Sequence, residues 1–327
     1  MSAEVYCRSR SPLLERVLVD FGADHSFDEA VKKVQEHYGV TVASSTTRLD
    51  VEKHARVIEQ SIDKYVDSQK IIKAEVVIGE TDGSMVPIVS QKESEAPVTD
   101  KRKNKKHEWR EARLALARAH GSVSPAYRAA ICSTDEAGEQ LASVVKEAGE
   151  GEKTKIHCLG DGALWVAEQV EQNFGSKATF TLDFYHVSEY LAAAATCCHP
   201  ETPRQWMHEQ QALLKSSLAG NVLENLKKHP MEVCTLKDKC LALKCYNYLS
   251  KRLAQLDYKA AIDAGLPIGS GEIESGHRSV IQKRLKISGA WWTVDNANSM
   301  LALRTLRING HWRKYWGNGT NTGAPQA

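Results

Sequence analysis

Between residues 127 and 198 the sequence alternates short apolar runs with helical patterns, and this alternation constrains the fold more than any other feature. Apolar runs bounded by turn residues are typical of strands, and apolar positions at a spacing of three and four are typical of helices. Strands that alternate with helices predict an α/β sheet. In order, strand first, the segments are Tyr127–Cys132, Asp135–Ala148, Lys155–Gly162, Ala163–Phe174, Ala178–Asp183 and His186–Cys198.

Residues 200–262 carry no strand pattern and predict an all-helical region that interrupts the sheet. A loop at Pro267–Gly271 follows, and helices are expected over Glu272–Ser288 and Val294–Ile308. Residues 317–327 are polar and rich in glycine, which is typical of a disordered tail.

The segment 73–119 predicts further strands. Ala74–Gly83 is typical of a strand that ends in a tight turn, and Met85–Val89 of its hairpin partner. Trp109–Ala119 fits a strand or a helix. The basic run Lys101–His107 fits either solvated surface or contact with phosphate.

The first 72 residues predict helices. Ser26 with Glu29 forms a capping box, and the helix that follows ends at Gly39. A second helix is expected from residues 43–48 to Val57, or as far as Tyr65. Two helices joined by a tight turn fit a helix-turn-helix or a plain helical hairpin. In the first case, the DNA-contacting residues near the start of the second helix are Ser45, Thr46 and Arg48.

Composition excludes several classes of protein. The chain has 327 residues, 42% of them hydrophobic, with 43 basic and 41 acidic side chains, so it is not a polycation. No apolar run approaches the roughly 20 residues of a membrane span, and the N-terminus has no secretory h-region. Its 8 cysteines form no CxxC pair. We therefore expect a cytoplasmic protein with reduced thiols; a zinc site at residues 197–208 is a weaker alternative.

Three acidic positions stand out. Asp82 and Asp161 each precede a glycine at the end of an apolar run, where a carboxylate reaches the edge of a sheet, although Asp-Gly is also a common turn pair. Glu272 and Glu274 lie about 200° apart on a helix. Glu274 shares a stripe with Arg278, Ile281 and Leu285, which predicts that it faces the packed side and Glu272 faces solvent. A pair between Glu274 and Arg278 is the alternative to a ligand site.

Together these carboxylates could gather around two Mg²⁺ ions, which Mn²⁺ could replace. The last helices also interleave basic and aromatic residues, such as Trp291, Trp292 and Trp312, a pattern that suits nucleic acid. The basic residues expected to contact DNA are Arg278, Lys283, Arg284 and Lys286.

Five motifs, in this order and spacing, resemble the DDE-type transposases of bacterial insertion sequences, in particular the ISKra type, which is akin to the Mutator-like group. The resemblance covers roughly residues 10–316. Its motifs are Thr81-Asp82-Gly83, Leu159-Gly160-Asp161-Gly162-Ala163, Asp183-Phe184-Tyr185-His186, Gly269-Ser270-Gly271-Glu272-Ile273-Glu274-Ser275, and the segment Lys283–Trp292.

The resemblance implies an α/β RNase H-like catalytic core with an all-α insertion, preceded by a helix-turn-helix region. It maps the catalytic, metal-binding triad onto Asp82, Asp161 and Glu274, and gives a supporting role to Asp183 and His186, which could also be an ordinary structural pair. The implied domains are residues 1–72 (DNA binding), 73–199 (first part of the core), 200–262 (insertion), 263–316 (helices completing the core) and 317–327 (tail).

The expected function is therefore a transposase. It cleaves double-stranded DNA at terminal inverted repeats with divalent metal and transfers the strand to target DNA by transesterification. Because two ends must be brought together, at least a homodimer on DNA is implied. Two alternatives remain: a non-catalytic DNA-binding repressor or domesticated transposase, and a structure-specific nuclease on the same core.

Overall fold

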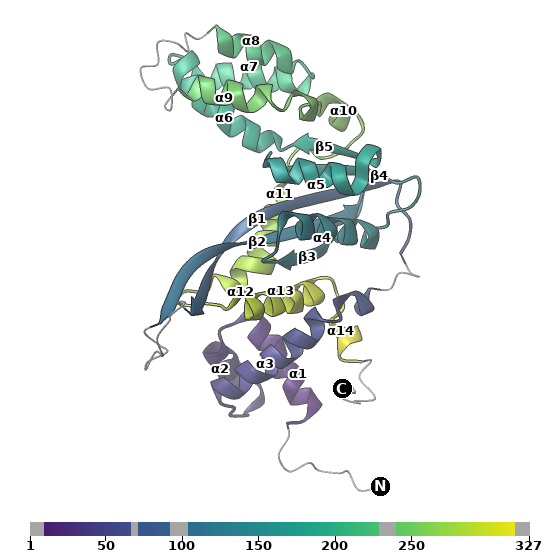
Figure 1. Cartoon of the computed structure of the whole chain (residues 1–327), viewed down its shortest axis with the longest axis vertical. Helices are drawn as coiled ribbons and strands as arrows, with labels where there is room; N and C mark the ends of the chain where they lie inside the picture. The colour runs from purple at the N-terminus through teal and green to yellow at the C-terminus, as the bar shows by residue number, and fades with distance from the viewer. Residues whose placement is uncertain (1–9, 67–70, 92–103, 229–239, 318–327) are drawn as a thin grey trace.

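The computed structural model describes residues 10–66, 71–91, 104–228 and 240–317. Along the long axis in Figure 1, an N-terminal helical bundle, a central sheet and a second helical body follow one another. The tail expected to be disordered lies, from residue 318 on, outside these ranges, as do Lys101–Lys103 of the basic run. No described helix is both long and apolar enough to cross a membrane.

The central sheet has five strands in the order β3-β2-β1-β4-β5. β1 pairs antiparallel with β2, and β2 with β3. On the other side β1 pairs in parallel with β4, and β4 with β5. The sheet is therefore mixed, with a hairpin side and a parallel side. The strands are β1 (Val76–Gln91), β2 (Lys105–Ala119), β3 (Ala126–Ala130), β4 (Lys155–Gly160) and β5 (Ala178–Leu182).

The predicted turn after Asp82 is wrong, because β1 runs through it without interruption and pairs with β2. Gly83 lies in mid-strand, opposite Arg113. A Cβ at Gly83 would lie 2.3 Å from the carboxylate of Glu111, so here the glycine makes room for a cross-strand side chain. Trp109–Ala119, for which the pattern allowed a strand or a helix, is part of β2.

Helices α4 (Thr134–Glu147) and α5 (Leu164–Phe174) cover one face of the sheet. Their apolar stripes pack on alternate residues of the strands. The buried cluster between them and the sheet includes Val77, Leu141, Val144, Ile156 and Val170.

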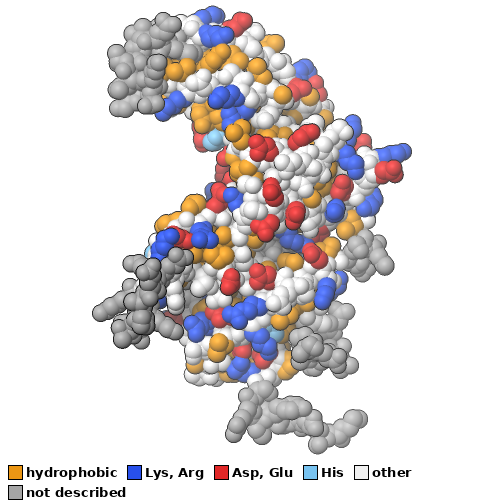
Figure 2. All heavy atoms as spheres, in the orientation of Figure 1, with side chains coloured by type: hydrophobic (Ala, Val, Ile, Leu, Met, Phe, Trp, Pro, Cys, Tyr) orange, Lys and Arg blue, Asp and Glu red, His pale blue; other side chains and the backbone are white. Residues whose placement is uncertain are grey.

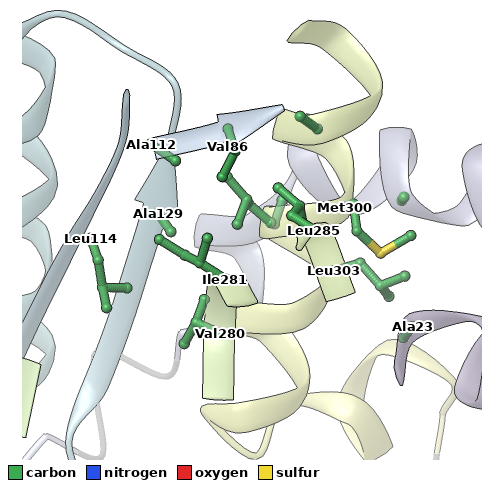
Figure 3. Packing of buried hydrophobic residues seen from close by; sticks show 14 of the residues in the cluster. Ala23, Val86, Ala112, Leu114, Ala129, Val280, Ile281, Leu285, Met300 and Leu303 are labelled. Carbon is green, nitrogen blue, oxygen red and sulfur yellow. The ribbon is translucent and has the colours of Figure 1, made fainter. Parts of the chain in front are cut away.

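The C-terminal helices cover the opposite face (Figure 3). The helix expected over Glu272–Ser288 is not regular. It is α11 (Gly271–Gly276), then a π-helical turn η7 (His277–Gln282), then α12 (Lys283–Leu285). Val86 and Leu114 of the sheet pack there against Ile281 and Leu285. The last helices are α13 (Val294–Ile308) and α14 (Trp312–Tyr315).

The N-terminal bundle packs against α13, so it shares a core with the sheet. Ser26 caps the second helix by accepting from the amide of Glu29, and Gly39 ends that helix with φ 65°. Asp24, at the end of the first helix, pairs with Arg304 at 2.8 Å and with Arg307 at 3.1 Å. The bundle comprises α1 (Pro12–Asp24), α2 (Phe27–Tyr38), α3 (Ser44–Glu59) and the 3₁₀ turn η1 (Ile62–Tyr65).

The described residues between 200 and 262 are all helical or irregular, as predicted. They form a separate hydrophobic cluster with α6, which follows β5 directly, so the helical body begins before residue 200. Buried Leu191, Leu214, Val222 and Leu249 are members of this cluster. Its elements are α6 (Phe184–Cys198), α7 (Pro203–Lys215), α8 (Ala219–Lys227), α9 (Leu241–Ser250), η6 (Leu253–Gln255) and α10 (Tyr258–Asp263); the 3₁₀ turn η3 (Gly175–Lys177) precedes β5.

Candidate active site at the ends of the parallel strands

Three aspartates lie at one level of the sheet, where the parallel pairing of β1, β4 and β5 ends. The β1–β4 register ends with Glu80 opposite Leu159, so Asp82 and Asp161 each come two residues later. The β4–β5 register ends with Gly160 opposite Leu182, so Asp161 and Asp183 each come one residue later. Since neighbouring strands lie about 4.8 Å apart, the register places the three aspartates side by side, with Asp82 inside β1 and Asp161 and Asp183 just after β4 and β5.

Asp82 is held by a histidine that the sequence reading missed. The imidazole of His277 donates from Nε2 to Oδ2 of Asp82 at 3.1 Å. The His277 side chain is 7% exposed and that of Asp82 is 37% exposed, so the contact orients a carboxylate that still reaches solvent. His277 is the first residue of the π-helical turn. Such turns are rare and are frequent at functional sites.

Glu80, two residues before Asp82 on the same face of β1, was also missed. Its Oε2 accepts from the amide of Ile273 at 2.8 Å, which fixes α11 across β1. Burial raises the pKa of Glu80 to about 8, against the opposing effects of the Ile273 amide and Arg118. Burial thus favours the neutral carboxyl, and its hydrogen bond to Ile273 anchors α11 to β1.

Asp161 begins the loop between β4 and α5. Its Oδ1 accepts from the amide of Ala163 at 2.9 Å, and Gly162 between them has φ 85°. That left-handed conformation favours glycine, so the Asp-Gly pair forms a tight turn here, as it does not at Asp82.

Asp183 caps α6 and anchors a distant loop. Its Oδ1 accepts from the amides of Tyr185, at 2.6 Å, and His186, at 3.3 Å. Its Oδ2 accepts from the amide of Ser270 at 3.0 Å and from the Ser270 hydroxyl. The imidazole of His186 instead faces Glu189 at 3.6 Å. The two expected supporting residues are thus linked through backbone, and Asp183 has a structural role at the edge of the site.

The prediction that Glu274 faces the packed side and Glu272 faces solvent is wrong. Glu274 is exposed, whereas Glu272 is half-buried and accepts from Nε of Arg118 at 2.7 Å. Among the described residues, Glu274 has no ion pair, with Arg278 or any other group. Its carboxylate is free to take a ligand.

The described residues contain no preformed cluster of three or more potential metal ligands. The register places Asp82 and Asp161 at one level of adjacent strands, and among the described residues Glu274 does not complete a three-ligand group with them. The donor set itself suits a hard cation, since carboxylate oxygens are the ligands of Mg²⁺.

The basic residues expected to contact DNA have different environments. Lys286 is exposed and donates to Ser84 Oγ at 2.8 Å, two residues beyond Asp82 on β1. Arg278 is exposed, and Lys283 pairs with Asp24 at 3.2 Å. Arg284 is 3% exposed and donates to the carbonyl of Gly22, so it does not reach the surface and its expected DNA contact is wrong.

The first turn of α3 carries the other expected contacts. Ser45 and Arg48 are exposed, and Thr46 is half-buried. The guanidinium of Arg48 lies 4.0 Å from the carboxylate of Glu52, one turn later. Figure 2 shows acidic and basic side chains mixed over the visible face, with a hollow in the outline between the upper helical body and the rest of the molecule.

Comparison with known sequences places the chain in a family. The family described as "Uncharacterised protein family (UPF0236)" matches residues 7–317, so the chain belongs to it. A curated relative, "UPF0236 protein in vanSb 3'region" of Streptococcus gallolyticus, is 26% identical over 201 residues. The match covers 60% of this chain and 43% of that relative.

Proposed function

We propose that this UPF0236 chain is a DDE transposase of the insertion-sequence type. It would cleave DNA at transposon ends and transfer the freed strand to target DNA. The proposal starts from the motif resemblance described above. The mixed sheet in the order β3-β2-β1-β4-β5 supports an RNase H-like core, because that arrangement pairs an antiparallel hairpin side with a parallel side.

One observation supports the proposal most strongly. Asp82 and Asp161 come two residues after the paired Glu80 and Leu159, so two carboxylates from distant segments lie at one level of adjacent strands. The Ile273–Glu80 hydrogen bond lays α11, which carries Glu274, across the same strand.

Asp82, Asp161 and Glu274 are the residues that would hold the metal ions. Bound Mg²⁺ or Mn²⁺ would supply activation of the attacking oxygen and stabilisation of the leaving oxygen. In the proposed reaction water breaks one phosphodiester bond and leaves a 3′-hydroxyl, which then attacks a target phosphodiester. His277 orients Asp82, and Lys286 gives a positive charge near that carboxylate for the DNA backbone.

The proposed partners are double-stranded DNA with terminal inverted repeats and a second copy of the chain. The exposed start of α3, with Ser45 and Arg48, is the proposed contact to the repeat.

A cleavage assay tests this function. Purified protein is incubated with Mg²⁺ or Mn²⁺ and a labelled duplex that carries the inverted repeat flanking the gene, beside Asp161→Ala and a scrambled duplex. Nicking at the repeat end that the variant lacks is the expected result. Binding of the repeat without cutting by either protein would favour the repressor, and cutting of branched DNA without regard to the repeat would favour a nuclease.

A further inference from the structure

Two side chains of the helical body hold the backbone of the loop that carries Asp161. Tyr248, on α9, donates from its hydroxyl to the carbonyl of Asp161 at 2.6 Å. Arg252, four residues later, donates to the carbonyl of Gly162 from Nε at 3.1 Å and from Nη2 at 2.8 Å. Three donated hydrogen bonds thus run from the helical body to two consecutive peptide groups.

These two side chains are themselves fixed. The guanidinium of Arg252 lies 4.3 Å from the centre of the Tyr248 ring and donates to the Tyr248 carbonyl at 3.1 Å. Tyr190, on α6, stacks on Tyr248 with the ring centres 4.1 Å apart and the planes 4° apart. His186 meets both tyrosine rings edge-on. Packing of this kind holds the donors in one rotamer, so little entropy is lost in making the bonds.

The turn has no room for a side chain at Gly162. A Cβ on Gly162 would lie 2.5 Å from Leu182 and 2.7 Å from the Tyr248 hydroxyl. On its other side, the Asp161 side chain is closed onto the Ala163 amide. The turn is therefore held from two sides, by Tyr248 and Arg252 on the carbonyls and by the Asp161 carboxylate on the Ala163 amide.

We propose that the base of the helical body is a positioning device for the Asp161 carboxylate, with Tyr248 and Arg252 as its positioning residues. The proposal rests on the function proposed above, in which Asp161 holds metal. The helices would then set the geometry of the site without contributing a ligand, and movement of the helical body would be transmitted to Asp161.

The test compares Tyr248→Phe, which removes only the donor, with Tyr246→Phe. Tyr246 lies on the same helix, where its ring packs under Lys227, and serves as a matched control. Hydrogen–deuterium exchange of peptides covering residues 159–166 reports the loop without metal or DNA. Titration of Mn²⁺, followed by the electron paramagnetic resonance signal of the free ion, reports the site, with Asp161→Asn as reference. Arg252→Lys provides a second variant if Tyr248→Phe folds poorly.

We expect Tyr248→Phe to speed exchange in this loop and to weaken Mn²⁺ binding about fivefold, equivalent to about 1 kcal/mol, with Tyr246→Phe at wild-type values. Unchanged exchange would show that the Tyr248 hydroxyl does not restrain the loop. Faster exchange with unchanged Mn²⁺ affinity would overturn the positioning role. If Asp161→Asn leaves Mn²⁺ binding intact, Asp161 is not a metal ligand, and the proposed function and the positioning role both fail. The exchange result would still decide whether Tyr248 restrains the loop.

Discussion

His277 donates to Asp82 across 3.1 Å, and this contact joins the π-helical turn to the middle of β1. The imidazole is almost fully buried, and its Nδ1 has no hydrogen-bond partner among the described residues. A buried donor that points at a half-exposed carboxylate restricts the rotamers of that carboxylate.

Replacing His277 with alanine should slow DNA cleavage about tenfold, equivalent to about 1.4 kcal/mol, because Asp82 loses its orienting partner. His277→Gln keeps an N–H donor and should recover part of the rate. Single-turnover cleavage of the repeat duplex measures both. Equal rates for wild type and the alanine variant would show that Asp82 does not depend on this contact.

Glu274 and Glu272 should differ sharply when each is changed to glutamine. Glu274→Gln removes a proposed metal ligand and should slow cleavage by roughly 100-fold or more while DNA binding persists. Glu272→Gln weakens the pair with Arg118 and should lower the free energy of unfolding by about 1 kcal/mol or less, with cleavage retained. The reverse pattern in the cleavage assay would assign the catalytic role to Glu272.

Asp24 predicts a stability change in acid. Burial disfavours its charge, but Arg307, Arg304 and Lys283 outweigh burial and lower the pKa of Asp24 from 3.8 to about 2. A carboxyl whose pKa is lower in the folded state stabilises the fold above its unfolded pKa and loses that effect as the pH falls through the folded pKa. The contribution, on the order of 2 kcal/mol, should therefore fade between pH 4 and pH 2.

Urea unfolding of Asp24→Asn and wild type at a series of pH values measures this. The two stabilities should converge as the pH falls below 4, and the variant should be the less stable protein at pH 6. A constant difference over the whole range would mean that the ion pairs with α13 do not stabilise the charged form.

Arg284 and Lys286 are expected to have different roles, Arg284 in the stability of the fold and Lys286 in binding DNA. The Arg284 guanidinium lies 4.7 Å from the ring centre of Phe27 and 4.8 Å from that of Trp292, and is buried. Arg284→Ala should lower the free energy of unfolding by about 3 kcal/mol, because it leaves a cavity and an unpaired carbonyl. Lys286→Ala should leave stability unchanged and weaken repeat binding with a smaller salt dependence. Calorimetry measures the stability of both variants, and repeat binding at two salt concentrations measures their affinity for DNA. Normal stability of Arg284→Ala would contradict its structural role.

Local pattern was enough to predict most of the elements and the turn at Asp161. Asp161 follows a short apolar run and sits in a true turn, so its setting could be read from the sequence. The same dipeptide at Asp82 gave a wrong prediction of a turn. Gly83 makes room for the side chain of Glu111 on β2, and the residues around Asp82 do not indicate that pairing. Glu80 could not be found, since its partner Ile273 lies 193 residues away.

The error over Glu274 has a physical cause. The stripe that joins Glu274 to Ile281 and Leu285 assumes a constant helical period. The π-helical turn at His277–Gln282 adds a residue to that turn and shifts the phase, so positions beyond it do not report the orientation of α11. His277 itself lies three residues after Glu274, and helical spacing was the one signal that could have suggested it.

The helical body lies between Asp183 and Ser270 in the sequence, and the contact between these two residues joins its two ends. The amide of Phe184 also donates to the carbonyl of Ile268 at 2.8 Å, so the chain enters and leaves the helical body at one point of the core. In connectivity it is a module: a relative could carry a longer or shorter helical body, or a linker, without moving the sheet. The helical body is not independent of the core in its contacts, however, because Tyr248 and Arg252 belong to it and hold the Asp161 loop. Any exchange that keeps the fold but loses those two donors would leave a well-folded core with an unsupported Asp161 loop.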